Sequence, residues 1–279
     1  MSVAYDHTPA LIVAVQHRDI KSATLLLETN ADVNAVNNKG IMALMVAVLI
    51  GDFKITHMLI EKNADVNART NDGSTALSAA VLFGDFKIAH MLIEENADVN
   101  AVDEDGTTAL MAAARAGHEQ IAALLIKKNA NMDALDFKGL TPLMWTVLSG
   151  HVKIATMLLD AKADVNAGNF SGITALLIAI HDGYADAVTM LLENNADIDA
   201  IAADGSTAIS TATKQGHTKI LAILRTARAV PALVPIRHVQ PAGVIQKRQR
   251  KMTDVYPKKH SSEDSTGRNR EKKSNKEKK

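Results

Sequence analysis

A single spacing dominates this chain of 279 residues, because its glycines recur every 33 residues. One series consists of Gly40, Gly73, Gly106, Gly139, Gly172 and Gly205, and a second of Gly51, Gly84, Gly117, Gly150, Gly183 and Gly216. A fixed period of about 20 to 50 residues is typical of repeat architectures, in which each unit packs mainly on its neighbours. We therefore expect a stack of similar units rather than one central core.

Apolar residues keep the same register as the glycines. One column consists of Leu26, Leu59, Leu92, Leu125, Leu158, Leu191 and Leu224, and the column beside it of Leu25, Met58, Met91, Leu124, Met157, Met190 and Ile223. Within residues 106–139, apolar residues recur at helical spacing before Gly117 and again after it. Each unit is thus predicted to hold two short helices joined by a glycine turn. The two columns are expected to form a continuous buried seam.

The residues at the ends of these helices follow the repeat as well. The first helix of a unit is expected to begin after a capping hydroxyl, at Thr75, Thr108, Thr141, Thr174 and Thr207. The residue after the second helix is Asn at 30, 63, 96, 129 and 195, and Lys at 162. Asn tolerates the left-handed conformation that often ends a helix. Residues 51–68 and 84–101 differ at only two positions, which indicates a duplication.

These residues resemble the consensus of the ankyrin-repeat family. The clearest unit reads Gly139-Leu-Thr-Pro-Leu-Met, then Gly150-His-Val-Lys-Ile-Ala-Thr-Met-Leu-Leu-Asp, and then Ala163-Asp-Val-Asn-Ala. The resemblance implies an all-α solenoid of helix-turn-helix pairs joined by β-turn or hairpin loops. It implies an ankyrin-repeat domain over residues 1–228, with about seven repeats at 8–40, 41–73, 74–106, 107–139, 140–172, 173–205 and 206–228. The family's His after Thr-Pro-Leu is absent throughout.

Composition and motifs argue against several classes of function. The chain has no Cys, which excludes disulfides and thiolate chemistry. Its start lacks a secretory signal, and no stretch is apolar enough for a membrane span, so we expect a cytoplasmic protein. No phosphate loop, dinucleotide glycine pattern, metal motif or nucleophile elbow occurs. The chain is therefore expected not to be an enzyme and to use no cofactor and no metal.

The family resemblance implies that a partner protein binds on the concave face of the stack, to a chain that is itself monomeric. Many positions expected on that face are apolar without a need in folding, namely Leu49, Ile50, Leu82, Phe83, Phe137, Leu140, Trp145, Leu148, Phe170 and Ile173. Contiguous apolar surface on a monomer usually marks an interaction site. We predict that this apolar band, with acidic Asp103, Glu104 and Asp105 beside it, binds the partner. The alternative is that the larger side chains are packed between repeats.

The end of the chain differs from the repeats in composition and charge. Residues 1–228 contain 17 basic and 26 acidic residues, whereas residues 229–279 contain 14 basic and 5 acidic ones. Residues 229–246 are predicted to be a capping or linker segment, and residues 247–279 a basic disordered tail. Lys247, Arg248, Arg250 and Lys251 fit a nuclear import signal.

Three roles for the whole chain stay open. The first is an adaptor or inhibitor in the cytoplasm or nucleus, and the second is a nuclear regulator of a transcription factor. The third is an effector that an intracellular bacterium exports into host cells, with the tail as the export signal. The tail alone also suits contact with nucleic acid or an acidic membrane, or simple solubilisation.

Overall fold

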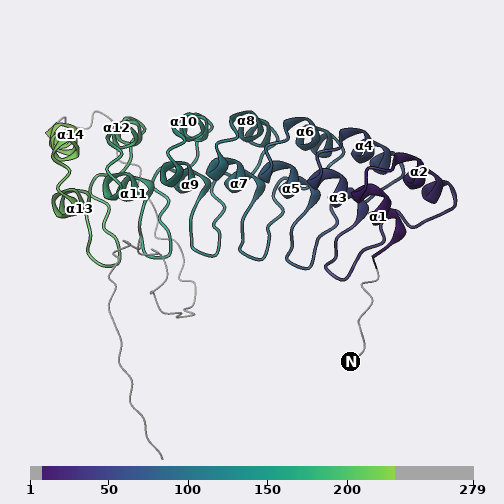
Figure 1. The fold of residues 1–279 in the computed structure, drawn as a ribbon. Coiled ribbons are helices and arrows are strands. Elements are labelled where there is room, and N and C mark those ends of the chain that lie inside the picture. The colour runs from purple at the N-terminus through teal and green to yellow at the C-terminus, as the bar shows by residue number, and fades with distance from the viewer. Residues whose placement is uncertain (1–7, 230–279) are drawn as a thin grey trace, which may run out of the picture. The chain divides into compact units, whose positions relative to one another are not determined.

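The structure is a computed structural model that describes residues 8–229, and these residues form paired helices (Figure 1). The pairs are α1 (Ala10–Gln16) and α2 (Ile20–Glu28), α3 (Ala43–Leu49) and α4 (Phe53–Glu61), α5 (Ala76–Leu82) and α6 (Phe86–Glu94), α7 (Ala109–Ala116) and α8 (Glu119–Lys127), α9 (Pro142–Ser149) and α10 (Val152–Asp160), α11 (Ala175–His181) and α12 (Ala185–Glu193), and α13 (Ala208–Gln215) and α14 (Thr218–Ala229). The all-α fold of stacked helix pairs is confirmed.

The odd-numbered helices form one row and the even-numbered helices a second row, with the connecting loops projecting beside the first (Figure 1). We call the surface formed by the odd-numbered helices and these loops the inner face. The loops are hairpins, since isolated antiparallel bridges join Val36 to Met42 and Val102 to Thr108. Neighbouring hairpins are also joined, because the Glu104 amide donates to the Asp72 carbonyl at 2.9 Å.

The predicted Leu column forms the centre of the core. Every member from Leu59 to Leu224 is fully buried, and Leu26 is partly buried at the first repeat. The neighbouring column is mostly half-buried, so the expectation of a continuous buried seam holds for the Leu column alone. It is wrong for Leu25, which is 61 % exposed. Among residues 8–229, no helix pair packs on the side of α1 and α2 that faces away from α3 and α4, which leaves such positions open to solvent.

The helix ends follow the predicted chemistry. Thr108 Oγ1 accepts a hydrogen bond from the Met111 amide at 3.2 Å, and Thr75, Thr141, Thr174 and Thr207 cap their helices in the same way. The predicted left-handed residues have positive φ, from 61° at Asn129 to 73° at Lys162.

The second helices begin in two different ways along the stack. Asp19, Asp52 and Asp85 precede α2, α4 and α6, and each carboxylate accepts a hydrogen bond from a first-turn amide. His118 and His151 precede α8 and α10 and cap nothing with their side chains. Their rings instead cover a glycine of the preceding repeat, since a Cβ on Gly117 would lie 2.5 Å from His151 Cε1.

Asparagines of the Ala-Asp-Val-Asn-Ala segments join each repeat to the next. Asn34 Oδ1 accepts from the Asp65 amide at 2.8 Å, and Asn67 Oδ1 accepts from the Asp98 amide at 2.7 Å. The Asn67 side-chain amide also donates to the Asn96 carbonyl at 3.1 Å. These bonds set the position of one hairpin relative to its neighbour.

The structure describes only the first residue of the expected segment 229–246, and this residue, Ala229, ends α14. The rest of that segment and the basic tail 247–279 lie outside the described residues. So do the import-signal residues Lys247, Arg248, Arg250 and Lys251. Among residues 8–229, no helix has the length and apolar character needed to cross a membrane.

Candidate functional site

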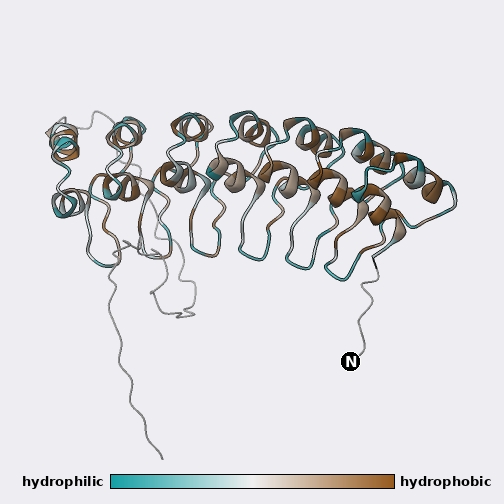
Figure 2. Ribbon diagram, viewed as in Figure 1, coloured by the Kyte–Doolittle hydropathy of each residue, from teal (hydrophilic) through white to brown (hydrophobic). Residues whose placement is uncertain are grey.

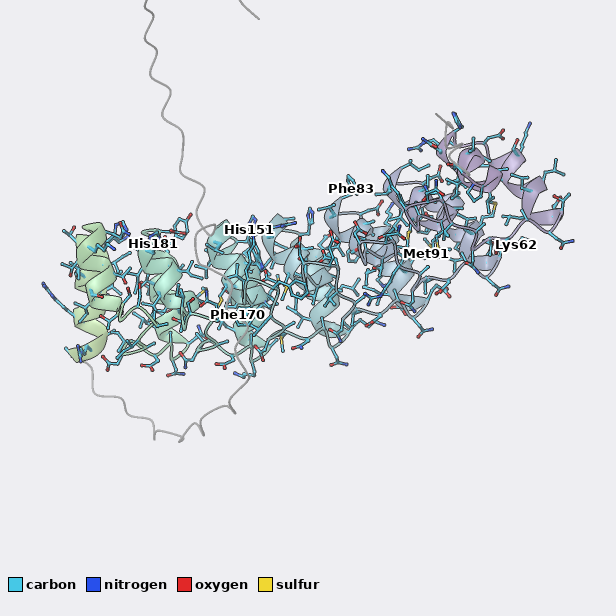
Figure 3. The ribbon with its side chains drawn as sticks, turned by 90° about the horizontal axis from the view of Figure 1, so that it is seen from below. Lys62, Phe83, Met91, His151, Phe170 and His181 are labelled. Carbon is cyan, nitrogen blue, oxygen red and sulfur yellow. The ribbon has the colours of Figure 1, made fainter. Side chains whose placement is uncertain are left out.

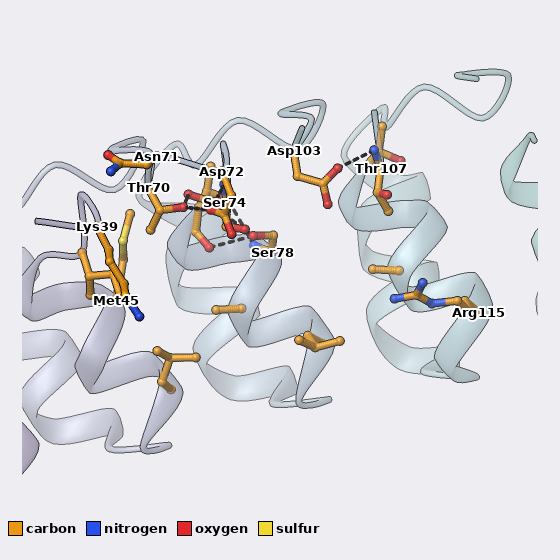
Figure 4. Close-up of a pocket in the computed structure, with 17 residues that line it drawn as sticks. Lys39, Met45, Thr70, Asn71, Asp72, Ser74, Ser78, Asp103, Thr107 and Arg115 are labelled. Carbon is orange, nitrogen blue, oxygen red and sulfur yellow. Dashed lines mark hydrogen bonds between the residues drawn. The ribbon is translucent and has the colours of Figure 1, made fainter. Parts of the chain in front are cut away.

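A groove lies on the inner face of repeats 2 to 4, between the odd-numbered helices and the hairpins (Figure 4). Its volume is about 460 Å³, which is within the range of side-chain and ligand pockets. Helices α3, α5 and α7 supply the floor and one wall, and the hairpins that precede them supply the other wall.

The floor of the groove is made of small side chains. Ser78, Ala79 and Ala112 line it, and in repeat 5 the position equivalent to Ala79 and Ala112 is Trp145. Leu49 and Leu82 form an apolar wall at the ends of α3 and α5. The two alanines at this position thus leave room in repeats 3 and 4 that Trp145 fills in repeat 5.

Trp145 follows the groove along the stack and is firmly held. Its Nε1 donates to Asp136 Oδ2 at 3.0 Å, and Asp136 is only 4 % exposed. The other oxygen, Asp136 Oδ1, accepts from the Leu140 amide at 2.8 Å. The guanidinium of Arg115 lies 5.6 Å from the centre of the Trp145 ring, a distance at which cation–π attraction is effective.

The hairpin wall of the groove carries carboxylates. Asp72 is bonded by the hydroxyl of Thr70 and by the Ser74 amide, and the Thr70 hydrogen bond is the main reason that the pKa of Asp72 lies below its ordinary value. Asp103 Oδ1 accepts from the amides of Asp105 and Thr107 at 3.0 and 2.8 Å (Figure 4). Each carboxylate thus holds its own hairpin in shape and also faces the groove.

The structure divides the predicted apolar band into two sets. Leu49, Leu82, Phe83, Phe137 and Phe170 are exposed, from 45 % for Leu49 to 72 % for Phe137. The partly buried set, Ile50, Leu140, Trp145, Leu148 and Ile173, packs against the core. The alternative interpretation, packing between repeats, thus describes this second set. Of the acidic residues, Glu104 and Asp105 are exposed and Asp103 is half-buried.

The exposed aromatic residues do not form one continuous patch. Phe83 lies at the edge of the stack where the two helices of each repeat join, whereas Phe170 lies on a hairpin (Figure 3). Phe137 and Phe170 each cover the preceding hairpin, since a Cβ on Gly106 or Gly139 would lie 2.9 Å from their rings. The exposed part of the band is therefore spread over two places on the inner face.

The predicted apolar band and its acidic neighbours do not include several residues that line the groove, among them Lys39, Thr70, Asp72 and Arg115. The 33-residue alignment held a signal for the hollow itself, because its column at 79, 112 and 145 changes from Ala to Trp. Within the described part of the chain, no group of three or more His, Asp or Glu side chains is placed to hold a metal ion.

Comparison with known families agrees with this geometry. A family model described as ankyrin repeats in three copies matches residues 11–103 and 97–169, and one described as ankyrin repeats in many copies matches residues 158–212. A search of curated proteins found no match. The matched residues extend from the first helix pair to the last and cover well over half of the chain. This chain therefore belongs to the ankyrin-repeat family.

Proposed function

We propose that this protein is a non-catalytic adaptor or inhibitor that binds a partner protein in the groove on the inner face of repeats 2 to 4. Ankyrin repeats imply a protein-interaction module. The observation that supports this particular surface is the groove itself, with Leu49 and Leu82 exposed along one wall. Exposed leucines beside a hollow of this size can stabilise a complex by burying apolar area against the partner.

Affinity capture with paired variants of the full chain tests this proposal. The groove variant carries Leu49→Gln and Leu82→Gln, at side chains that are 45 % and 54 % exposed. The matched control carries Leu25→Gln and Phe53→Gln on the even-numbered helices, at side chains that are 61 % and 44 % exposed. Circular dichroism first establishes that both variants are folded.

The expected result is a set of proteins that the unaltered chain and the control both recover and the groove variant does not. Recovery of the same proteins by all three chains would show that the groove is not the binding surface. Loss with the control alone would assign binding to the opposite face, which the even-numbered helices form.

A further inference from the structure

The negative charge of the repeats is concentrated in the hairpin connections. The six connections between helix pairs, residues 29–42, 62–75, 95–108, 128–141, 161–174 and 194–207, contain 14 acidic and 6 basic residues. This net charge of −8 accounts for nearly all of the −9 carried by residues 1–228. In Figure 2, which shows hydropathy, the loops are more hydrophilic than the helices of the first repeats. The remaining residues of 1–228 thus have a net charge of −1, and the inner face has a negative edge.

One of the three connections that line the groove is the most acidic of the six. Residues 95–108 contain Glu95, Asp98, Asp103, Glu104 and Asp105 and no basic residue. Among the hairpin carboxylates in residues 8–229, Asp199 alone forms an ion pair, with Arg228 at 3.2 Å. Within residues 8–229, the carboxylates beside the groove therefore have no basic side chain paired with them.

The groove combines this charge with an apolar hollow. One wall is aliphatic, at Leu49 and Leu82, while the opposite wall carries Asp72 and Asp103. Lys39 and Arg115 also line the groove and mark its ends (Figure 4). Arg115 lies against the Trp145 ring. A ligand that complements this groove has an apolar side chain that enters the hollow. It also has positive charge that faces Asp72 and Asp103, at a place between Lys39 and Arg115.

We infer that the groove of repeats 2 to 4 binds an extended basic segment of a partner protein, which places an aliphatic side chain over Ala79 and Ala112 and Lys or Arg side chains toward Asp103, Glu104 and Asp105. This inference rests on the proposed function and specifies the partner's chemistry. Complementary charge raises the association rate and selects among partners, and burial of the aliphatic side chain adds affinity. A nucleic acid is disfavoured, because its phosphates would face the acidic wall.

The charge variant of the test keeps the shape of the hairpin. It carries Asp103→Asn, Glu104→Gln and Asp105→Asn in the full chain. Asn is compatible with position 103, because Asn37 occupies the equivalent place and its Oδ1 accepts from the amides of Lys39 and Ile41 in the same way.

The matched control neutralises Asp197, Asp199 and Asp204 to Asn in connection 194–207. That connection lies outside the groove and, like connection 95–108, has no basic residue. Both variants change the net charge equally.

A second variant, Ala112→Trp, fills the hollow. It reproduces Trp145 in a repeat where Asp103 stands at the place of Asp136, so an acceptor for the indole N–H is at hand.

Fluorescence anisotropy with short labelled peptides provides the measurement. The probe has one central Leu flanked by lysines, a second peptide has Ser in place of Leu, and a third has Glu in place of the lysines. The probe should bind most tightly, and affinity should fall about tenfold in the charge variant and less than about threefold in the matched control. Ala112→Trp should remove the preference for Leu over Ser. Added salt should weaken binding to the unaltered chain more than to the charge variant.

The inference would be overturned if the acidic peptide bound as tightly as the probe. It would also be overturned if the affinity for the probe fell equally in the charge variant and in the matched control. A further peptide has the sequence of residues 247–279. If it binds more tightly than the probe, the groove binds this chain's own segment, and the inference of an external partner is overturned. If captured proteins are lost with Leu49→Gln and Leu82→Gln but kept in the charge variant, the groove binds a partner of other chemistry. In that case the proposed function stands and this inference fails.

Discussion

The inner face differs between repeats 3 and 4 and the two repeats that follow, although the backbone is the same in both regions. At one equivalent position the side chains are Ala79 and Ala112 in the first region and Trp145 and Ile178 in the second. The first region is hollow, and in the second these larger side chains pack against the core or within it. The buried columns thus fix the stack, whereas the side chain at this position of the inner face is small beside the groove and large in the two repeats that follow.

The largest effect is expected from breaking the core that the two regions share. Leu125 lies on α8 at the junction of these regions and is fully buried. Leu125→Asp places a carboxylate in an apolar seam, and we expect a loss of more than about 4 kcal/mol or separate melting of the two regions. Thermal unfolding followed by circular dichroism measures this. An unchanged melting temperature would contradict a continuous core.

A smaller effect is expected from making repeat 5 resemble the hollow region. Trp145→Ala removes a half-buried ring, the hydrogen bond to Asp136 and the contact with Arg115. The free energy of unfolding should fall by about 2–3 kcal/mol, measured in urea. Trp145→Phe keeps a ring but lacks the N–H donor, and should cost about 1 kcal/mol. Equal losses for the two variants would show that the ring itself contributes little.

A third effect concerns the second helices of repeats 3 and 4, which begin after Asp85 and after His118. Asp85→Ala removes the cap of α6, where Asp85 Oδ1 accepts from the Ile88 amide at 3.0 Å, and should cost about 1 kcal/mol in urea unfolding. Asp85→Asn keeps an acceptor and should cost little. His118→Ala, at the equivalent position of the next repeat, removes ring packing but no cap. A similar loss for Asp85→Asn and Asp85→Ala would mean that charge, rather than the hydrogen bond, stabilises this helix.

The smallest effect concerns the carboxylate of the hollow region. Thr70→Val removes the hydroxyl that lowers the pKa of Asp72, so this pKa should rise toward its ordinary value. Because the folded-state pKa is lowered, the related stability is present above the unfolded-state pKa and disappears as the pH falls through the folded-state value. The two proteins should therefore differ slightly at neutral pH and converge in acid. Carboxyl chemical shifts of Asp72 during an NMR titration test this, with Thr70→Ser as the control that keeps a hydroxyl.

The sequence predicted the stack because its structural residues obey one period. Leu125, Thr108 and Asn129 have the roles that the repeat assigns to them. The candidate site was harder to predict, because the exposure of a side chain depends on the size of its neighbours. Leu82 is exposed beside a hollow lined by Ala79, whereas Leu148 packs against the core in the repeat of Trp145. Such differences become visible only when the alignment is read for side-chain volume.

The near-identity of residues 51–68 and 84–101 has a consequence for how this protein can change in length. The two segments differ only at Thr56/Ala89 and Lys62/Glu95, and both occur between neighbours of the same geometry. Recombination between the matching stretches would add or remove one whole repeat without creating a foreign junction. Because the groove residues from Thr70 to Leu82 lie between these two segments, each such event would also lengthen or shorten the peptide segment that the groove can hold.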